Sequence, residues 1–190
     1  MTTLLLIRHG DTEAIGKLLM GWMPGWHLTL GGREKVERLA QRLSALPIRA
    51  AYSSPLERAL ETAELIGRPH GLFPIPVDEL GEMRFGSWEG LTVQELDQRE
   101  DWRRFNTVRS VVRPPGGELM LETQARMVRQ IEQLRSRHRD ETVAVVSHGD
   151  PLRAAVAHYL GLPIDQMQRF EIDTASVTVL QAGEIGRAHV

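Results

Sequence analysis

The sequence has no cysteine, and this absence removes several classes of structure and chemistry. Its 190 residues can form no disulfide, supply no thiolate to zinc or to an iron–sulfur cluster, and provide no cysteine nucleophile. A chain of this length buries enough surface to fold without such cross-links. We therefore expect a single domain over residues 1–190, built on an ordinary hydrophobic core.

Lysine, excess charge and long apolar runs are also scarce. Only two of the 23 basic residues are lysine, which leaves 21 arginines. Genome composition explains most of that bias, although guanidinium groups also grip oxyanions well. The net charge of -2 argues against a nucleic-acid partner. No apolar run approaches the roughly 20 residues that a membrane-spanning helix needs, so we expect no membrane partner and a cytoplasmic location.

Four short apolar runs, with helical patterns between them, predict an α/β fold. Charged residues, glycine or proline flank each run, which favours buried strands. Strands that alternate with helices form a mostly parallel sheet with both faces covered. We therefore expect a three-layer α/β/α sandwich. The predicted strands are 4–7, 50–53, 143–147 and 176–180, and the predicted helices cover about 36–46, 56–66 and 121–134.

The segment from about 73 to 117 differs from the rest of the chain. It contains four prolines and five glycines, and its apolar periodicity is weaker. We interpret it as an insertion of loops and short helices that covers the site, and not as a second domain. Two signals outside it predict helix starts: Ser54 as a capping residue before Pro55, and the pair Asp150-Pro151.

Two histidines directly follow predicted strands, and glycine follows each of them. Arg8-His9-Gly10 ends the first strand, and His148-Gly149 ends the strand over 143–147. Ligands of open α/β sheets bind beyond the carboxyl ends of the strands. His148 also stands before a helix, whose N-terminal N–H groups favour an anion. Either histidine alone fits a structural loop residue, but the repeated arrangement favours a shared site.

Arg58 and Glu82 add a cation and an acid. Arg58 lies in the first turn of a predicted helix, where it opposes the helix dipole unless an anion is near. The alternative is a surface arginine paired with Glu57 or Glu61. Glu82 lies in a glycine-rich segment and would act as a general acid if burial raised its pKa, whereas a solvated carboxylate would be structural.

In this order, the motifs resemble those of the histidine phosphatase superfamily, also called the phosphoglycerate mutase-like family. Each motif alone is a weak signal, but five in the family's order along nearly the whole chain are a strong one. The resemblance implies the phosphoglycerate mutase-like fold. The motifs are Arg-His-Gly at 8–10, Tyr-Ser-Ser-Pro-Leu-x-Arg-Ala at 52–59, Glu…Phe-Gly-x-Trp-Glu-Gly at 82–90, Pro-x-Gly-Gly-Glu at 114–118 and Val-Ser-His-Gly at 146–149.

The resemblance implies a role for each motif residue. His9 would be the nucleophile that forms a phosphohistidine, and Glu82 would protonate the leaving oxygen and then activate water. Arg8, Arg58 and His148 would hold the phosphoryl oxygens, His148 at least partly protonated. No metal or cofactor is implied, and the partner is a small phosphorylated substrate, with a homodimer left open. The implied substrate-binding residues are Arg8, Arg58, His148, Gly149, Thr12, Gly21 and Arg84.

Four departures from the mutase pattern favour hydrolysis over mutase activity. Ile15 replaces an asparagine that contacts phosphate, and Leu18 replaces an arginine. Residues 82–86 read Glu-Met-Arg-Phe-Gly where mutases have Glu-Arg-His-Tyr-Gly, although Arg84 would restore part of the lost contact. The length of 190 residues leaves no room for the mutases' long basic insert. We expect a metal-independent phosphomonoester hydrolase with an open pocket.

Three alternatives remain. The first is a phosphoglycerate mutase primed by 2,3-bisphosphoglycerate. The second is a non-catalytic protein that binds a phosphorylated ligand, and the third is a zinc hydrolase that uses His9, His148 and a further ligand. Insertion arginines would select the substrate group, although most of them are expected to be solvated. These are Arg84, Arg103, Arg104, Arg109 and Arg113.

Overall fold

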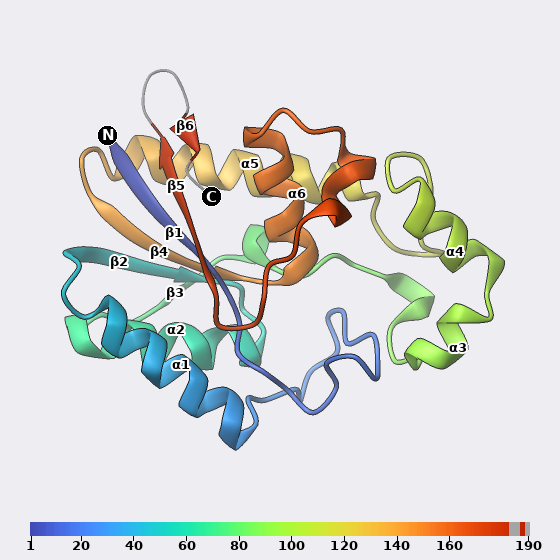
Figure 1. Cartoon of the computed structure of the whole chain (residues 1–190), viewed down its shortest axis with the longest axis horizontal. Coiled ribbons are helices and arrows are strands. Elements are labelled where there is room, and N and C mark those ends of the chain that lie inside the picture. The colour runs from blue at the N-terminus through green and yellow to red at the C-terminus, as the bar shows by residue number, and fades with distance from the viewer. Residues whose placement is uncertain (183–186, 189–190) are drawn as a thin grey trace.

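The computed structural model describes residues 1–182 and 187–188. Its strands are β1 (Thr2–Arg8), β2 (Ile48–Ser53), β3 (Ile75–Pro76), β4 (Thr142–Ser147), β5 (Val177–Ala182) and β6 (Arg187–Ala188). They form one sheet in the order β3-β2-β4-β1-β5-β6 (Figure 1), parallel from β3 to β1 and antiparallel at β5 and β6. The mostly parallel sheet and its four predicted strands are confirmed. The sequence did not predict β3 and β6, because two residues are too few to show a pattern.

Helices cover both faces of this sheet. Helices α1 (Leu30–Leu43) and α2 (Glu57–Gly67) lie on one face, and α5 (Met120–Arg137) and α6 (Gly149–Tyr159) lie on the other (Figure 1). Alternate side chains of β1 point to opposite faces, so Leu4 and Leu6 join the core under α5 and α6. Leu5 and Ile7 join the core under α1 and α2. The predicted three-layer sandwich is therefore confirmed.

The segment over 73–117 contains β3, two short helices and two 3₁₀ turns. The helices are α3 (Val93–Asp97) and α4 (Glu100–Thr107), and the turns are Asp78–Leu80 and Gly86–Trp88. Its aromatic side chains pack together, with Trp88 edge-on to Trp102 and to Phe105. The same cluster includes residues of α5 and α6. The segment therefore packs against one end of the sandwich.

Both predicted helix starts need correction. Helix α2 begins at Glu57 with Leu56 as its N-cap, and no side chain caps it, so Ser54 and Pro55 lie outside the helix. The Ser54 hydroxyl instead lies 2.7 Å from a ring nitrogen of His148. Helix α6 begins at Gly149 with His148 as its N-cap.

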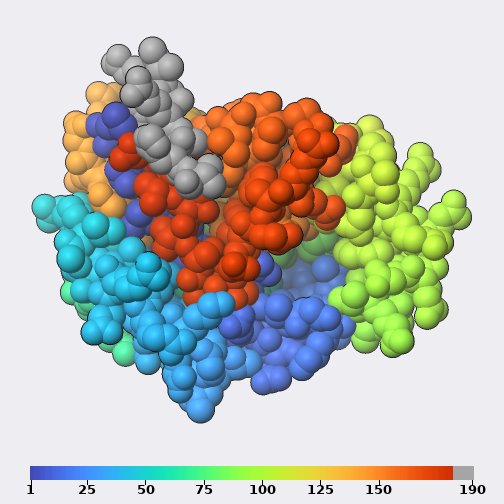
Figure 2. Space-filling model, in the orientation of Figure 1, coloured from blue at the N-terminus to red at the C-terminus, as the bar shows by residue number. Residues whose placement is uncertain are grey.

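The sheet topology brings three strand ends together. Because β1, β2 and β4 are parallel, their carboxyl ends lie at one edge of the sheet. The register places Arg8 beside Ser147, and the N–H groups of His9 and Ser54 still bond to carbonyl oxygens of β4, at 3.0 and 2.9 Å. His148 follows β4 directly. In Figure 2, the surface is hollowed where the N-terminal loop (blue), the C-terminal helical region (orange) and the 91–112 region (yellow-green) meet.

None of the helices in the described part of the chain is both long enough and apolar enough to span a membrane.

Candidate active site

The two strand-end histidines lie side by side in the structure. The ring centroids of His9 and His148 are 5.0 Å apart, and the planes are inclined at 60°. Both side chains are buried, with exposed fractions of 2% and 0%. The structure therefore brings together two residues that are 139 positions apart in the chain.

The hydrogen bond of His9 determines which of its ring nitrogens carries the proton. Its Nδ1 lies 2.8 Å from the carbonyl oxygen of Gly10. A carbonyl only accepts, so Nδ1 carries the proton and Nε2 keeps its lone pair. Burial, with a further contribution from Arg58, lowers the pKa of His9 to about 3. The neutral ring is the form that can act as a nucleophile.

His148 is held by a different partner. Its Nε2 lies 2.7 Å from the hydroxyl of Ser54, and that hydroxyl accepts the N–H of Leu56 at 3.3 Å. The hydroxyl proton is thus available to Nε2, and in that arrangement Nδ1 carries the ring proton. Nδ1 lies 4.0 Å from Oε2 of Glu82. Burial, followed by Arg58, lowers the pKa of His148 well below its ordinary value.

Arg58 is a fully buried cation, so its interpretation as a surface arginine is wrong. Its Nη2 donates to the carbonyl oxygen of Gly21 at 2.9 Å. Its Nε and Nη1 are buried without a hydrogen-bond partner among the residues that the structure describes. Burial lowers the pKa of Arg58, and the charge of Glu82 opposes this shift. Buried donors left unpaired cost free energy, which an oxyanion would recover.

Arg8 contributes a second guanidinium group. Its Nη1 donates to the carbonyl oxygen of Ile172 at 2.7 Å, while its Nε is buried and unpaired within the described residues. Gly149, the first residue of α6, lies against this group: a Cβ there would be 3.3 Å from Cζ of Arg8. The positive end of the α6 dipole and two guanidinium groups therefore meet at one place, which favours an anion.

Glu82 supplies an acid beside these cations. Its side chain is 14% exposed, and Oε1 accepts the N–H of Met83 at 2.8 Å. Burial is the main cause that raises the pKa of Glu82 to about 7, and Asp150 raises it further, while Arg58 opposes the shift. A carboxyl group that titrates near neutrality can both give and take a proton.

One cleft contains these groups. At its polar end lie Arg8, His9, Arg58, Glu82 and Gly149. The remaining wall comes mostly from the loop after β1 and is largely apolar. It consists of Ile15, Gly16, Leu18, Leu19, Met20, Gly21, Phe85, Asp150 and Arg153.

Three predicted substrate-binding residues, Thr12, Arg84 and His148, do not line this cleft. His148 is buried beside His9. Thr12 is buried, and its hydroxyl donates to the sulfur of Met20 at 3.3 Å. Arg84 is exposed, with its Cζ 3.9 Å from the centroid of the Trp22 ring. None of the other predicted insertion arginines lines the cleft either. The 73–117 segment instead contributes Glu82 and Phe85.

Sequence reasoning missed several residues that hold the site together. Ser54 lies within a recognised motif, and Asp150 follows His148-Gly149, so the pattern contained a signal for both. Asp150 is paired with Arg109 at 2.7 Å and with Arg153 at 3.5 Å. The carbonyl of Ile172 had no signal, because a backbone acceptor is not visible in the side-chain pattern.

The arrangement fits an oxyanion better than a metal ion. Across residues 1–182 and 187–188, no group of three or more His, Asp or Glu side chains is placed to hold a metal. The polar end of the cleft presents N–H groups and two guanidinium cations, and these attract phosphoryl oxygens.

Comparisons with known proteins point the same way. The family model of the histidine phosphatase superfamily (branch 1) matches residues 4–189. Phosphoserine phosphatase 1 of Hydrogenobacter thermophilus is 34% identical over 188 residues, which cover 97% of this chain and 88% of that protein. A 2,3-bisphosphoglycerate-dependent phosphoglycerate mutase of Brucella melitensis is 35% identical over 188 residues, covering 90% and 88%. Among solved structures, Bacillus stearothermophilus YhfR matches with a TM-score of 0.94 at 31% identity, covering 100% of this chain and 96% of that one.

Proposed function

This chain belongs to the histidine phosphatase superfamily, branch 1, and from that membership and the site geometry we propose that it hydrolyses phosphomonoesters of small metabolites through a phosphohistidine. One observation carries the proposal. His9, whose Nε2 keeps its lone pair, lines one cleft with Arg8 and Arg58, which have unpaired buried N–H groups, and with Glu82, whose pKa is raised to about 7. These are the parts that phosphoryl transfer needs.

In the first step, Nε2 of His9 attacks phosphorus and the bond from phosphorus to the ester oxygen breaks. The leaving oxygen takes the proton of Glu82, so a neutral alcohol departs. Arg8, Arg58 and the N-terminus of α6 bind the phosphoryl oxygens during the transfer. The dianion also favours the protonated form of His148, whose Nδ1 then donates to it.

In the second step, water attacks the phosphohistidine. The carboxylate of Glu82 takes a proton from that water, the bond from phosphorus to Nε2 breaks, and inorganic phosphate leaves. His9 returns to its neutral form and Glu82 to its protonated form, so the cycle closes. Positioning and charge stabilisation supply the rate, and the scheme uses no metal and no cofactor.

The wall of the cleft favours hydrolysis over mutase activity. Ile15 and Leu18, the two apolar replacements in the mutase pattern, both line the cleft. Neither can hydrogen-bond a phosphate or a carboxylate of the substrate. A phosphoglycerate would therefore lose the contacts that keep it bound while the phosphoryl group returns.

Because charged phosphomonoesters do not cross membranes unaided, we propose that the enzyme acts in the cytoplasm.

The test is a panel of phosphomonoesters assayed with a chelator present. It includes sugar phosphates, phosphoserine, phosphoglycerate and an aryl phosphate, and it measures both phosphate release and phosphoglycerate isomerisation. We expect release to continue in the chelator, and we expect His9→Ala to reduce it by at least about 1,000-fold. His158→Ala, which removes an exposed histidine, is the matched control.

Four outcomes would contradict the proposal. Isomerisation that is faster than phosphate release would favour the 2,3-bisphosphoglycerate-dependent mutase. Loss of activity in the chelator would favour metal-assisted hydrolysis. Substantial release by His9→Ala would remove the nucleophile from the scheme, whereas anion binding without any turnover would indicate a binding protein.

A further inference from the structure

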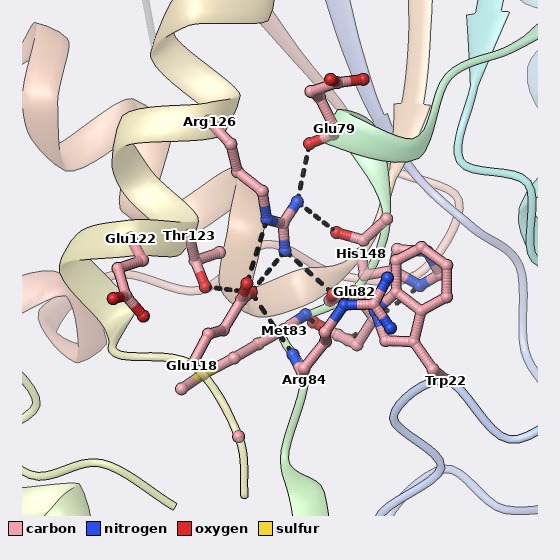
Figure 3. A network of polar contacts seen from close by, with 12 residues as sticks. Trp22, Glu79, Glu82, Met83, Arg84, Glu118, Glu122, Thr123, Arg126 and His148 are labelled. Carbon is pink, nitrogen blue, oxygen red and sulfur yellow. Dashed lines mark hydrogen bonds and ion pairs between the residues drawn. The ribbon is translucent and has the colours of Figure 1, made fainter.

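A single arginine of α5 forms hydrogen bonds with the backbone of the loop that carries Glu82. Arg126 donates to the carbonyl oxygens of Glu79, Gly81 and Glu82 at 2.6, 2.8 and 2.9 Å (Figure 3). Its other two N–H groups donate to the carboxylate of Glu118 at 2.7 and 3.4 Å. All five guanidinium donors are thus used, three of them on the backbone of one short segment.

The same loop is held from its other side. The indole Nε1 of Trp22 donates to the carbonyl oxygen of Glu82 at 2.6 Å, so this carbonyl accepts from both Trp22 and Arg126. Glu118 is fixed in turn by the hydroxyl of Thr123 at 2.5 Å and by the N–H of Arg84 at 3.3 Å. The segment 79–82 is therefore clamped between α5 and the loop after β1.

The clamp replaces regular secondary structure at this point. Gly81 and Glu82 follow the 3₁₀ turn Asp78–Leu80 and belong to no helix or strand. Their carbonyl groups accept hydrogen bonds from side chains instead. The Arg126 and Glu118 side chains are only 16% and 15% exposed, which strengthens their charge-assisted hydrogen bonds. Removal of Arg126 would leave three carbonyl groups without this donor and Glu118 without its cation.

We propose that Arg126 is a positioning residue for the reaction. It holds the backbone of Glu82 so that the carboxyl group stays in the cleft, where Oε2 lies 4.0 Å from Nδ1 of His148. Arg126 does not line the cleft, so it acts through Glu82 and not on the substrate. Proton transfer depends steeply on the placement of the acid, and an error of about 1 Å can cost on the order of 100-fold. The inference rests on the function proposed above, in which Glu82 moves the proton.

The test compares Arg126→Met with Arg126→Lys and with a control, Arg129→Met. Arg129 is an exposed arginine on the same helix. For an alkyl phosphate, whose leaving group needs a proton, we expect Arg126→Met to lower kcat/KM by about 10- to 100-fold. For p-nitrophenyl phosphate, which needs no proton, the loss is expected to be several times smaller. Inhibition by inorganic phosphate and the activity of Arg129→Met should stay near wild type.

A double variant separates positioning from general damage. If Arg126 acts through Glu82, Arg126→Met should cause no further loss of kcat/KM in the Glu82→Gln background. Losses that multiply, or equal losses on both substrates, would overturn the inference. Wild-type kcat/KM of Glu82→Gln for the alkyl phosphate would instead contradict the proposed function, so the two failures are distinguishable. Thermal unfolding monitors the fold, and Arg126→Lys completes the same cycle if Arg126→Met does not fold.

Discussion

The pKa of the Glu82 carboxyl group is raised although two arginines line the same cleft. Burial disfavours its charged form more strongly than Arg58 and Arg8 favour it, and the negative charge of Asp150 adds to that effect. The pKa of Glu82 is therefore raised to about 7, whereas the pKa of His9 is lowered to about 3. Below about pH 7, one cleft thus holds a neutral imidazole and a protonated carboxyl group.

The raised pKa of Glu82 predicts how the rate of the proposed first step, phosphoryl transfer to His9, depends on pH. Glu82 must be protonated to serve as the acid, so kcat/KM for an alkyl phosphate should fall as pH rises above about 7. We expect Glu82→Gln to lower kcat/KM by about 100-fold below pH 7 and to remove this basic limb. Steady-state kinetics between pH 5 and 9, with p-nitrophenyl phosphate as a reference that needs no acid, would check this. A basic limb that survives in Glu82→Gln would assign it to another group.

At the scale of elements, an ion pair joins the loop that follows α4 to the first turn of α6. Nη1 of Arg109 lies 2.7 Å from Oδ2 of Asp150, with side-chain exposures of 6% and 15%. The Arg109 guanidinium also lies over the Phe105 ring, 4.6 Å from its centroid. Burial opposes ionisation of Asp150, but Arg109 lowers the pKa of Asp150 below its usual value. The pair therefore keeps a charged carboxylate in the cleft that Glu82 also lines.

Removing one partner of this pair should destabilise the protein. Arg109→Met leaves Asp150 buried with only the longer contact to Arg153, so we expect a loss of about 3 kcal/mol in the free energy of unfolding. Denaturant unfolding measures it. The control Arg103→Met, an exposed arginine of α4, should change stability by less than about 0.5 kcal/mol. Adding Asp150→Asn to Arg109→Met should recover part of the loss, and a further drop would show that the charge is not its cause.

For the whole molecule, the buried histidines link stability to pH. His9 and His148 have lowered pKa values in the folded state, so below about pH 6.5 the unfolded chain binds more protons at these positions. Each such proton makes the free energy of unfolding fall by about 1.4 kcal/mol per pH unit as the pH decreases. Glu82 acts in the opposite direction, because its pKa is raised: its contribution is lost as pH rises from about 4.5 to about 7.

The contribution of the two histidines exceeds the opposite contribution of Glu82, so the protein should lose stability as the pH decreases. Between pH 6.5 and 5 we expect the free energy of unfolding to fall by about 1 kcal/mol per pH unit from these groups. Urea unfolding across this range measures the slope. His148→Gln should flatten it, whereas His158→Gln, which changes an exposed histidine, should not. An unchanged slope in His148→Gln would mean that other groups control acid unfolding.

Much of this architecture follows from local patterns. The strands β1 and β4 are apolar runs that end in Arg-His and in Ser-His, so both the sheet and the two central histidines could be predicted. Helix starts were less predictable. Ser54 resembles an N-cap in the sequence, but its hydroxyl bonds to His148, a residue 94 positions away. Local signals do not report such distant competition for a donor.

The sequence by itself determined the order of strands and helices, the family and the residues at the polar end of the cleft, because each depends on short-range pattern. Only the tertiary structure decided that Thr12 and Arg84 lie outside the cleft, and that Arg109 forms an ion pair with Asp150. It also decided that Arg126 holds the Glu82 loop. These assignments depend on which distant partner each side chain meets in a crowded interior, and spacing along the chain does not contain that information.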